Sequence, residues 1–467
     1  MTGIERHFQS AARAAAGDAG QRGRIGNSMR NYATARSTRV AQFQDWQAAR
    51  AAASGIKREA IDRLDEHLAS FADRVESRGG RVFFATDDTE AREYVLRVIR
   101  RRRAKRVVKS KTMTSEEIHL NEALVGAGCE VIESDLGEYI VQLLKEAPFH
   151  FVFPAMHLSR GQIADLFRRE LMEPCTDDPA ELTMIARRVL RQVYASADVG
   201  ISGANFAIAE TGMISITENE GNARLTTSLP PVHIALVGIE KVLPRMSDLA
   251  LLLPMLATSG TGQALTCYNS LISGPRRPGE PDGPVEFHVV LLDNGRSDLL
   301  ADAEQRDALH CIRCGACLNV CPVFNTIGGH AYGATYQGPI GSVITPHLRG
   351  LKQWGHLSHA SSLCGACTDI CPVKIDLHHH LIHNRRNRAA GDANWRERSL
   401  YRFFAAAMNR PWLYRLAGRI GRWTQAWRDG LEGTRFDPLK GWSTERRLPP
   451  LAESSFRDLW RGRTSRG

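Results

Sequence analysis

The sequence contains no run of apolar residues long enough to cross a lipid bilayer. Its longest apolar stretch, residues 249–257, has nine residues and includes Pro254, whereas a membrane-spanning helix needs about 20. The first residues also lack the apolar core of a secretory signal. We therefore expect a cytoplasmic chain, in which structural disulfides between the ten cysteines are disfavoured.

A second absence is the dinucleotide-binding fingerprint. No G-x-G-x-x-G motif follows a predicted strand, so binding of flavin or nicotinamide through that motif is not supported. Acidic residues are not in surplus either, because the net charge is +10. The basic excess is local: residues 385–467 hold 19 Lys+Arg and 8 Asp+Glu, against 42 and 43 in the rest of the chain.

Seven of the ten cysteines lie in two short motifs. The first reads C-x2-C-x2-C-x3-C-P over residues 311–322, and the second repeats Cys-Gly-Ala-Cys and Cys-Pro-Val 50 residues later. This spacing is typical of bacterial ferredoxins with cubane clusters. A zinc ribbon does not need a four-cysteine run that ends in proline. The sequence therefore predicts two iron–sulfur clusters, most simply [4Fe-4S] in both sites.

The ferredoxin pattern also divides the ligands, because the cysteine before each proline binds the other cluster. Cluster I is expected to bind Cys311, Cys314, Cys317 and Cys371, and cluster II to bind Cys321, Cys364 and Cys367. Ser361 stands where the second motif would need a further cysteine. Cluster II is then a four-iron cluster with a weak oxygen or outside ligand, a [3Fe-4S] cluster, or a four-iron cluster completed by a partner. We expect it to be the more labile cluster.

Histidines offer another fourth ligand for cluster II, as in Rieske centres. Those near the motifs are His310, His330, His347, His356, His359, His378, His379, His380 and His383. Structural or surface roles are the more common ones for such residues, and we prefer them here. The segment between the motifs, which carries Tyr332 and Tyr336, is expected to fold over the clusters and limit access of water.

Upstream of the motifs, strand and helix patterns alternate. Strands are predicted at 81–85, 106–108, 129–132, 149–153, 229–238 and 285–292, and helices at 88–103, 136–144, 162–171 and 180–194. Thr114, with Glu117 three residues later, predicts a capping box that opens a further helix. This alternation predicts an open α/β sheet with helices on both faces. Residues 1–55 are expected to form an extended arm or loose helices.

Two features of this α/β region suggest a ligand site. The glycine-rich stretch 198–217, with Asn205 and Glu210, can bring backbone amides close to a ligand. Lys109 and Lys111 can supply an anion site on the same side of the sheet. The alternative is a set of tight turns with Glu210 capping an end, and we prefer it because glycine patterns are weak evidence.

The run KSKTMTSEEI at residues 109–118, the segment GANFAIAETG at 203–212 and the two cysteine motifs follow one another in order. From about residue 56 to its end, the chain resembles the lactate-utilisation iron–sulfur proteins, the B component of a three-part L-lactate oxidation system. The resemblance implies an α/β domain similar to the phosphosugar isomerase and CoA-transferase group, then a two-cluster ferredoxin-like module and a family-specific C-terminal domain. We therefore expect an N-terminal arm at 1–55 and domains at 56–300, 301–384 and 385–467.

The resemblance further implies an electron carrier of an NAD-independent L-lactate dehydrogenase complex. Its implied partners are the cysteine-rich lactate-utilisation protein A and lactate-utilisation protein C. Oxidation of lactate to pyruvate releases two electrons, which two one-electron clusters can take one at a time. An alternative is an acyl- or CoA-transfer enzyme that uses Glu210 as its catalytic carboxylate, with the clusters structural or regulatory. That alternative depends on an analogy of fold alone.

The C-terminal region holds six of the eight tryptophans among its arginines. Roughly helical spacing connects Tyr401, Phe404, Trp412, Leu416, Ile420, Trp423 and Trp427. One interpretation is a small helical domain packed on the clusters. The other is a docking surface for a partner protein or for the inner face of a membrane. Nucleic-acid binding is disfavoured, because no recognition motif accompanies the charge.

Overall fold

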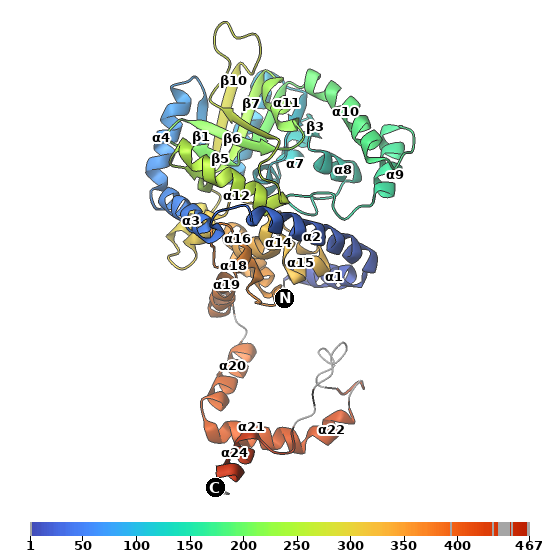
Figure 1. Ribbon diagram of the computed structural model, residues 1–467, viewed down its shortest axis with the longest axis vertical. Coiled ribbons are helices and arrows are strands. Elements are labelled where there is room, and N and C mark those ends of the chain that lie inside the picture. The colour runs from blue at the N-terminus through green and yellow to red at the C-terminus, as the bar shows by residue number, and fades with distance from the viewer. Residues whose placement is uncertain (1, 393–394, 432–433, 438–448, 450–451, 465–467) are drawn as a thin grey trace. The chain divides into compact units, whose positions relative to one another are not determined.

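The structure is a computed structural model that describes residues 2–392, 395–431, 434–437, 449 and 452–464 (Figure 1). It divides into two compact units, residues 1–389 and 390–467. The first unit contains the α/β region and both cysteine motifs, and the second contains the tryptophan-rich helices.

The centre of the first unit is a six-stranded parallel sheet. Its strands are β1 (Arg81–Ala85), β2 (Arg106–Lys109), β3 (Glu130–Glu133), β4 (Val199–Gly203), β7 (Val232–Gly238) and β10 (Glu286–Leu292), in the order β1-β10-β7-β4-β2-β3. Successive side chains of a strand point to opposite faces. In β10, Phe287 and Val289 therefore pack into one apolar core while Val290 and Leu292 pack into another.

Helices cover both faces of this sheet, as the alternating pattern predicted. One face packs against α5 (Asp88–Arg102) and α7 (Leu120–Gly126). The other packs against α4 (Leu64–Glu76), α8 (Leu136–Leu144) and α10 (Pro179–Ser196), with α9 (Arg160–Leu171) behind α8 and α10. The fold class predicted for this region is confirmed at the level of a parallel α/β sheet.

A second, smaller sheet follows from the glycine-rich stretch. It has the order β8-β5-β6-β9, formed by β8 (Val242–Leu243), β5 (Phe206–Ile208), β6 (Met213–Glu218) and β9 (Tyr268–Ile272). Helix α11 (Asn222–Ser228) contacts β6 and the large sheet, and α12 (Leu249–Thr261) follows β8. These strands have two to six residues, and the sequence pattern did not separate them from turns.

Two local predictions were wrong. Residues 149–153 form a tight turn instead of a strand, because the His150 ring nitrogen Nδ1 accepts hydrogen bonds from the amides of Val152 and Phe153. Helix α6 (Met113–Glu117) begins after Thr112 without a side-chain cap, so no capping box forms. Glu117 instead lies buried in an ion pair with Arg296.

The region around the cysteine motifs is helical. It contains α13 (Arg296–Ala301), η3 (Arg306–His310), α14 (Ala316–Asn319), α15 (Pro322–Ile327), η4 (His330–Tyr332), α16 (Gly338–Arg349), α17 (Leu351–Trp354), η5 (Gly355–His359), α18 (Ala366–Ile370) and α19 (Leu377–Asp392). Helices α14 and α18, which begin inside the two motifs, contact each other. A helical ferredoxin-like region therefore follows the α/β sheet, as predicted.

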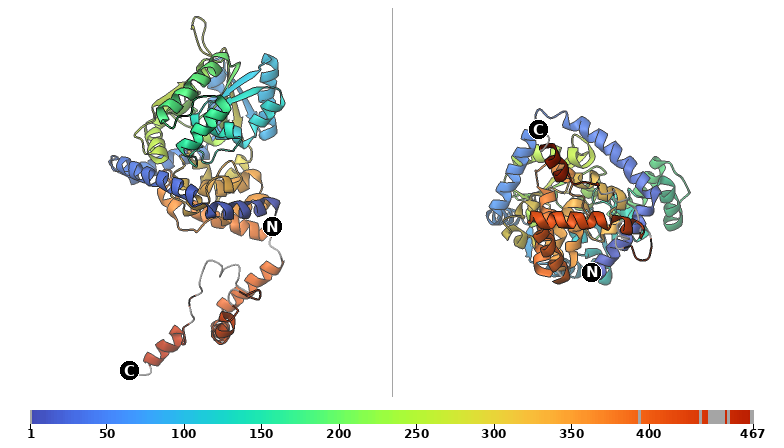
Figure 2. Two further views of the ribbon diagram at one scale, coloured as in Figure 1. Left: turned by 90° about the vertical axis from the view of Figure 1, so that its right-hand side faces the viewer. Right: turned by 90° about the horizontal axis from the view of Figure 1, so that it is seen from below.

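The first residues form three ordered helices: α1 (Gly3–Gly17), α2 (Ala19–Val40) and α3 (Trp46–Asp62). Each begins at a capping side chain, Thr2, Asp18 or Asp45, that accepts an amide hydrogen bond. Helix α1 contacts η4, α15 and α17, and α2 contacts α12 and α15. Figure 2 shows these blue helices lying along the orange helices of the cysteine region. Residues 3–55 therefore lie mostly in packed helices, and the expectation of an extended arm or loose helices was wrong.

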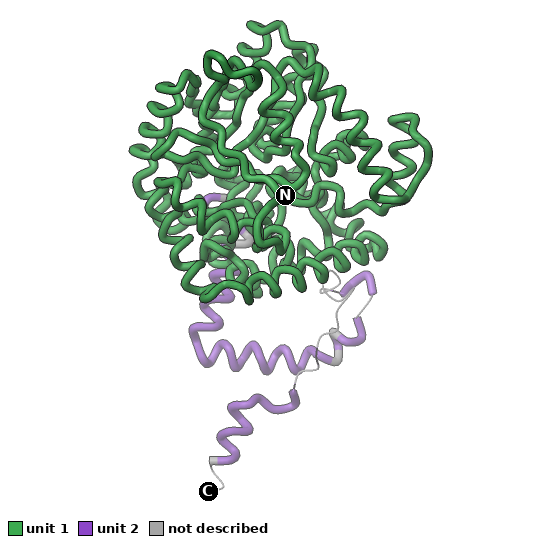
Figure 3. Tube along the Cα trace, turned by 45° about the horizontal axis from the view of Figure 1, so that its top comes forward, with its two compact units in different colours: residues 1–389 green, residues 390–467 purple. Residues whose placement is uncertain are grey.

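The second unit, coloured purple in Figure 3, contains α20 (Trp395–Met408), α21 (Pro411–Trp423), α22 (Gln425–Asp429) and α24 (Phe456–Thr464). The aromatic and aliphatic side chains singled out from the sequence, from Tyr401 to Trp427, are exposed. Trp442, one of the six tryptophans, lies outside the described residues. Within the described part of the chain, no helix combines the length and the apolar character that crossing a membrane requires.

Candidate functional site

The two cysteine motifs have the same backbone conformation. Gly315 (φ 81°) precedes α14, and Gly365 (φ 82°) precedes α18. Two residues earlier, Arg313 (φ 59°) and Leu363 (φ 54°) are also left-handed, which is uncommon for residues other than glycine. The repeat seen in the sequence is therefore a repeat in three dimensions.

The four thiols predicted for cluster I lie around one small cavity. Cys311, Cys314, Cys317 and Cys371 line it together with Ile340 of the segment between the motifs. Backbone amides point at the sulfurs: Arg313 N lies 3.4 Å from Cys311 Sγ, and Ile375 N lies 3.4 Å from Cys371 Sγ. Four converging thiols with amide donors match the donor set of a cubane cluster.

The three thiols predicted for cluster II are less enclosed. Cys321 and Cys367 are buried, but Cys364 is exposed. Burial raises the pKa of Cys367 to about 11, whereas the Ala366 amide lowers the pKa of Cys364. The Ser361 hydroxyl accepts a hydrogen bond from Leu363 N at 3.0 Å. This bond is the counterpart of the one from Arg313 N to Cys311 Sγ, so the hydroxyl takes the position of the missing thiol.

The N-terminal helices contribute directly to the cluster I site. Arg50 of α3 donates from Nε to the Cys371 carbonyl oxygen at 2.9 Å and from Nη2 to the Thr368 carbonyl oxygen at 3.2 Å. Tyr32 of α2 donates to the Ser259 carbonyl oxygen at 2.5 Å. Residues that the sequence assigned to an arm therefore hold the backbone that carries a predicted ligand.

A larger cavity, of about 360 Å³, lies between the carboxyl ends of the sheet strands and the first motif. Its lining includes Lys111 after β2, Gly203 and Asn205 at the end of β4, Lys241 after β7, and Arg313, Cys314 and Tyr336 from the cysteine region. A side chain at residue 203 would not fit, because its Cβ would lie 2.6 Å from Thr112 Oγ1.

A buried charge network borders this cavity. Glu240 accepts from Arg296 Nε at 2.5 Å and from Arg313 Nη2 at 3.1 Å. Arg296 also binds both oxygens of Glu117 at 2.8 Å, and Tyr336 donates to Glu117 at 2.6 Å. Burial alone would raise the pKa of Glu240, but the two arginines lower it to about 2. The cluster I motif is thus locked to the sheet through Arg313.

The anion site predicted from Lys109 and Lys111 is only partly formed. Lys109 is buried, and its ammonium group lies 2.9 Å from Glu116 and 2.7 Å from Glu133, so it is not free to bind a ligand. Lys111 does line the larger cavity, where it donates to the Val152 carbonyl oxygen at 2.7 Å.

Sequence reasoning missed Lys241, Arg313 and Tyr336 as cavity residues. The sequence held a signal for two of these three residues. Arg313 lies inside the first C-x2-C loop, and Lys241 follows the end of a predicted strand.

Glu210, the candidate catalytic carboxylate, does not line either cavity. It is exposed, and its carboxylate accepts a hydrogen bond from Met246 N at 2.7 Å, at the start of η2 (Met246–Asp248). The position does not favour an acyl- or CoA-transfer role.

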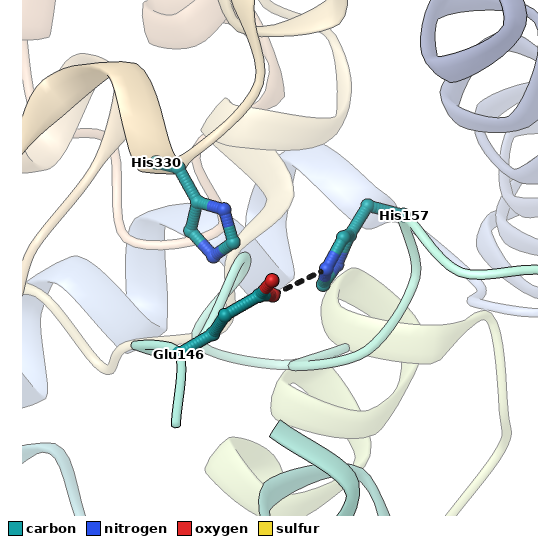
Figure 4. Close-up of side chains that lie close together, drawn as sticks. All are labelled: Glu146, His157 and His330. Carbon is teal, nitrogen blue, oxygen red and sulfur yellow. Dashed lines mark hydrogen bonds and ion pairs between the residues drawn. The ribbon is translucent and has the colours of Figure 1, made fainter. Parts of the chain in front are cut away.

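Several of the candidate histidines have other partners. His347 lies 3.1 Å from Asn384 Oδ1, His356 lies 3.1 Å from the Gln353 carbonyl oxygen, and His378 lies 2.8 Å from Thr368 Oγ1. Figure 4 shows His330 beside His157 and Glu146. His157 Nε2 lies 3.0 Å from Glu146 Oε2. His330 Nε2 lies 2.8 Å from the Ala147 carbonyl oxygen. These contacts agree with the preferred structural roles.

Comparison with known families divides the chain into three parts. Residues 68–292 match the LUD domain, residues 307–375 match the 4Fe-4S dicluster domain, and residues 377–465 match the C-terminal domain of lactate utilisation protein B.

A crystal structure of a DUF162 family protein from Deinococcus radiodurans covers 49% of this chain and 98% of its own, with 15% identity and a TM-score of 0.27. A likeness this low supports no conclusion about the fold.

Curated relatives match over nearly the whole chain. The lactate utilization protein B of Shouchella clausii is 42% identical over 447 residues, which covers 95% of this chain and 94% of the relative. The proteins of the same name from Bacillus velezensis and Anoxybacillus flavithermus are 43% and 42% identical, over 95% and 94% of this chain and 94% and 93% of their own. At this identity and coverage, the chain belongs to the lactate utilization protein B family.

Proposed function

We propose that this protein is the iron–sulfur electron-transfer component of a system that oxidises L-lactate to pyruvate. The observation that carries the proposal is the convergence of four thiols, three from one motif and one from the other, on a single cavity. When bound, two clusters accept and pass on single electrons, which suits an oxidation that releases two. Lactate is proposed as the substrate because the chain belongs to the lactate utilization protein B family.

Each part of the chain has a defined task in this proposal. Cys311, Cys314, Cys317 and Cys371 hold cluster I, and Cys321, Cys364 and Cys367 hold cluster II. The buried side chain of Ile340, from the intermotif segment, lines the cluster I cavity and would limit access of water to the cluster. Both clusters are proposed as [4Fe-4S]; for cluster II the alternatives are a [3Fe-4S] cluster, an oxygen or outside ligand, or a ligand from a partner.

The partners proposed are the cysteine-rich lactate-utilisation protein A and lactate-utilisation protein C, in an NAD-independent L-lactate dehydrogenase complex. The location proposed is the cytoplasm, with peripheral contact with the inner face of the membrane as the alternative. The exposed aromatic side chains of α20 and α21, among arginines, suit a partner surface or a peripheral membrane contact. We propose domains at 56–300, 301–384 and 385–467, after an N-terminal segment at 1–55. We also propose a relationship of the α/β domain to the phosphosugar isomerase and CoA-transferase group.

The proposal is tested on protein prepared and handled under argon. Iron and acid-labile sulfide are quantified, and electron paramagnetic resonance is recorded after addition of L-lactate with and without the two partner proteins. We expect reduction of the clusters by lactate only when the partners are present. A colourless protein without sulfide, or rapid reduction by lactate of this protein alone, would contradict the proposal.

A further inference from the structure

The larger cavity lies where open α/β sheets bind their ligands. The chain leaves β2 toward β3, on one side, and leaves β4 toward β7, on the other. Adjacent strands with connections in opposite directions create a crevice outside their carboxyl ends. Residues 110–114, after β2, and residues 203–205, at the end of β4, both line the cavity. The fold therefore provides a ligand site in addition to the cluster sites.

The cavity is lined by two cationic side chains with unused hydrogen-bond donors, the buried Arg313 and the half-buried Lys241. The Arg313 side chain is only 9% exposed, and its Nε and Nη1 atoms are buried without a hydrogen-bond partner. Its guanidinium lies 4.7 Å from the centre of the Tyr336 ring, which fixes its orientation. Lys241 lines the same cavity, and among the described residues its ammonium group has no hydrogen bond or ion pair. Unpaired buried donors are unfavourable, so an acceptor is expected beside Arg313 Nε and Nη1, and Lys241 lies where it can bind the same acceptor.

The charges around this end of the cavity do not balance. Four cationic side chains and two carboxylates meet here: Lys57, Arg296 and Arg313 with Glu117 and Glu240 in the buried network, and the half-buried Lys241 close enough to interact with Glu240. An anion of low charge would reduce this excess. The lining also includes Asp135, Glu218 and Glu220, which disfavours a multiply charged phosphate. A carboxylate, in contrast, has the planar shape that the fork of an arginine binds.

We infer that this cavity binds a small monocarboxylate of the 2-hydroxy acid or 2-oxo acid class, with Lys241 and Arg313 holding the carboxylate. The class of acid is inferred from the proposed function, and the location of the site is inferred from the cavity. The wall of the cavity includes Cys314, so the bound acid would lie beside the cluster I site. The protein would then hold substrate or product next to its own electron carrier.

A competing explanation is that Lys241 only offsets the negative charge of the thiolate-bound cluster. The two explanations differ in one measurement, the affinity for the acid. Equilibrium dialysis of the cluster-containing protein alone, under argon, measures binding of pyruvate and of L-lactate. Acetate and inorganic phosphate are measured in parallel.

We expect saturable binding of pyruvate or lactate at one site per chain. Lys241→Met and the milder Lys241→Gln should weaken it at least tenfold, with iron content unchanged. Lys105→Met, at an exposed lysine away from the cavity, should leave the affinity unchanged. Acetate and phosphate should bind more weakly than the 2-substituted acids.

Three results would overturn the inference. The first is that the protein binds neither pyruvate nor lactate, although its clusters are intact and lactate still reduces them when the partners are present. This result leaves the proposed function standing. The second is an unchanged affinity in both Lys241 variants with a shifted cluster potential, which indicates charge compensation. The third is phosphate binding as tight as pyruvate binding. If pyruvate binds but lactate never reduces the clusters with partners present, only the proposed function fails.

Discussion

The two cluster sites are built from one repeated motif, yet they differ in their surroundings. In the first, four thiols, three of them buried, line one cavity, and Arg50 and Arg313 tie the motif loops to distant parts of the chain. In the second, Cys364 is exposed and a serine hydroxyl stands in the position of the fourth thiol. A local repeat therefore sets the backbone of both sites, while long-range packing protects only one of them.

The difference is clearest at equivalent positions of the repeat. Arg313 and Leu363 have the same left-handed backbone conformation. Arg313 donates a hydrogen bond to Glu240, after β7, whereas the apolar side chain of Leu363 cannot form an ion pair. The cluster I loop is thus anchored to the sheet by an ion pair whose carboxylate is 1% exposed. We expect cluster I to be the stable carrier and cluster II the labile one.

The largest expected effect follows from Cys314→Ala, which removes a buried thiol proposed as a ligand of cluster I. Because binding of a metal centre contributes directly to folding free energy, loss of cluster I should destabilise the whole first unit. We expect iron content to fall by more than half and the urea midpoint to drop, measured under argon. Normal iron and an unchanged midpoint would mean that Cys314 is not a ligand.

Cys364→Ala should have a smaller and more local effect, because this thiol is exposed. The protein should keep cluster I and its fold and lose about half of its iron, as expected when one of two four-iron clusters is absent. Iron analysis, paramagnetic resonance of the remaining cluster and circular dichroism test this. Loss of both clusters would show that the two sites do not differ as the structure indicates.

Arg50→Met tests whether the N-terminal helices protect cluster I. The substitution removes two hydrogen bonds from a charged donor to the Cys371 and Thr368 carbonyl oxygens, each worth about 1.5–3 kcal/mol. We expect a lower free energy of unfolding and faster loss of cluster I in air. Arg58→Met, at an exposed residue of the same helix, is the matched control, and equal behaviour of the two variants would refute the role of Arg50.

Ser361→Cys should produce the smallest change and make the two cluster sites more alike. It supplies the thiol that the repeat lacks, so cluster II should bleach several-fold more slowly in air, as a complete set of thiolate ligands predicts. Ser361→Ala is the control and should not slow bleaching. Equal lifetimes of cluster II in the wild type and both variants would mean that residue 361 does not face the cluster.

Much of the fold was predictable from local patterns. The strands at β1 and β10 and the helices α5 and α8 lie within one residue of their predicted bounds, because each shows its own apolar periodicity. The errors arose where one distant side chain changed a local preference. Glu117 pairs with Arg296 and not with the start of its own helix, and Lys109 is neutralised by Glu133.

The cysteine repeat and the alternation of strands and helices can be recognised in the sequence, because each depends on residues close together in the chain. How deeply each cysteine site is buried depends instead on packing between distant segments. That packing brings Arg50 to the backbone of the second motif and Arg313 of the first motif to Glu240, and it places Lys241 and Arg313 in the same cavity. Burial and electrostatic pairing depend on segments far apart in the chain, and no local sequence pattern predicts which of these segments will be in contact.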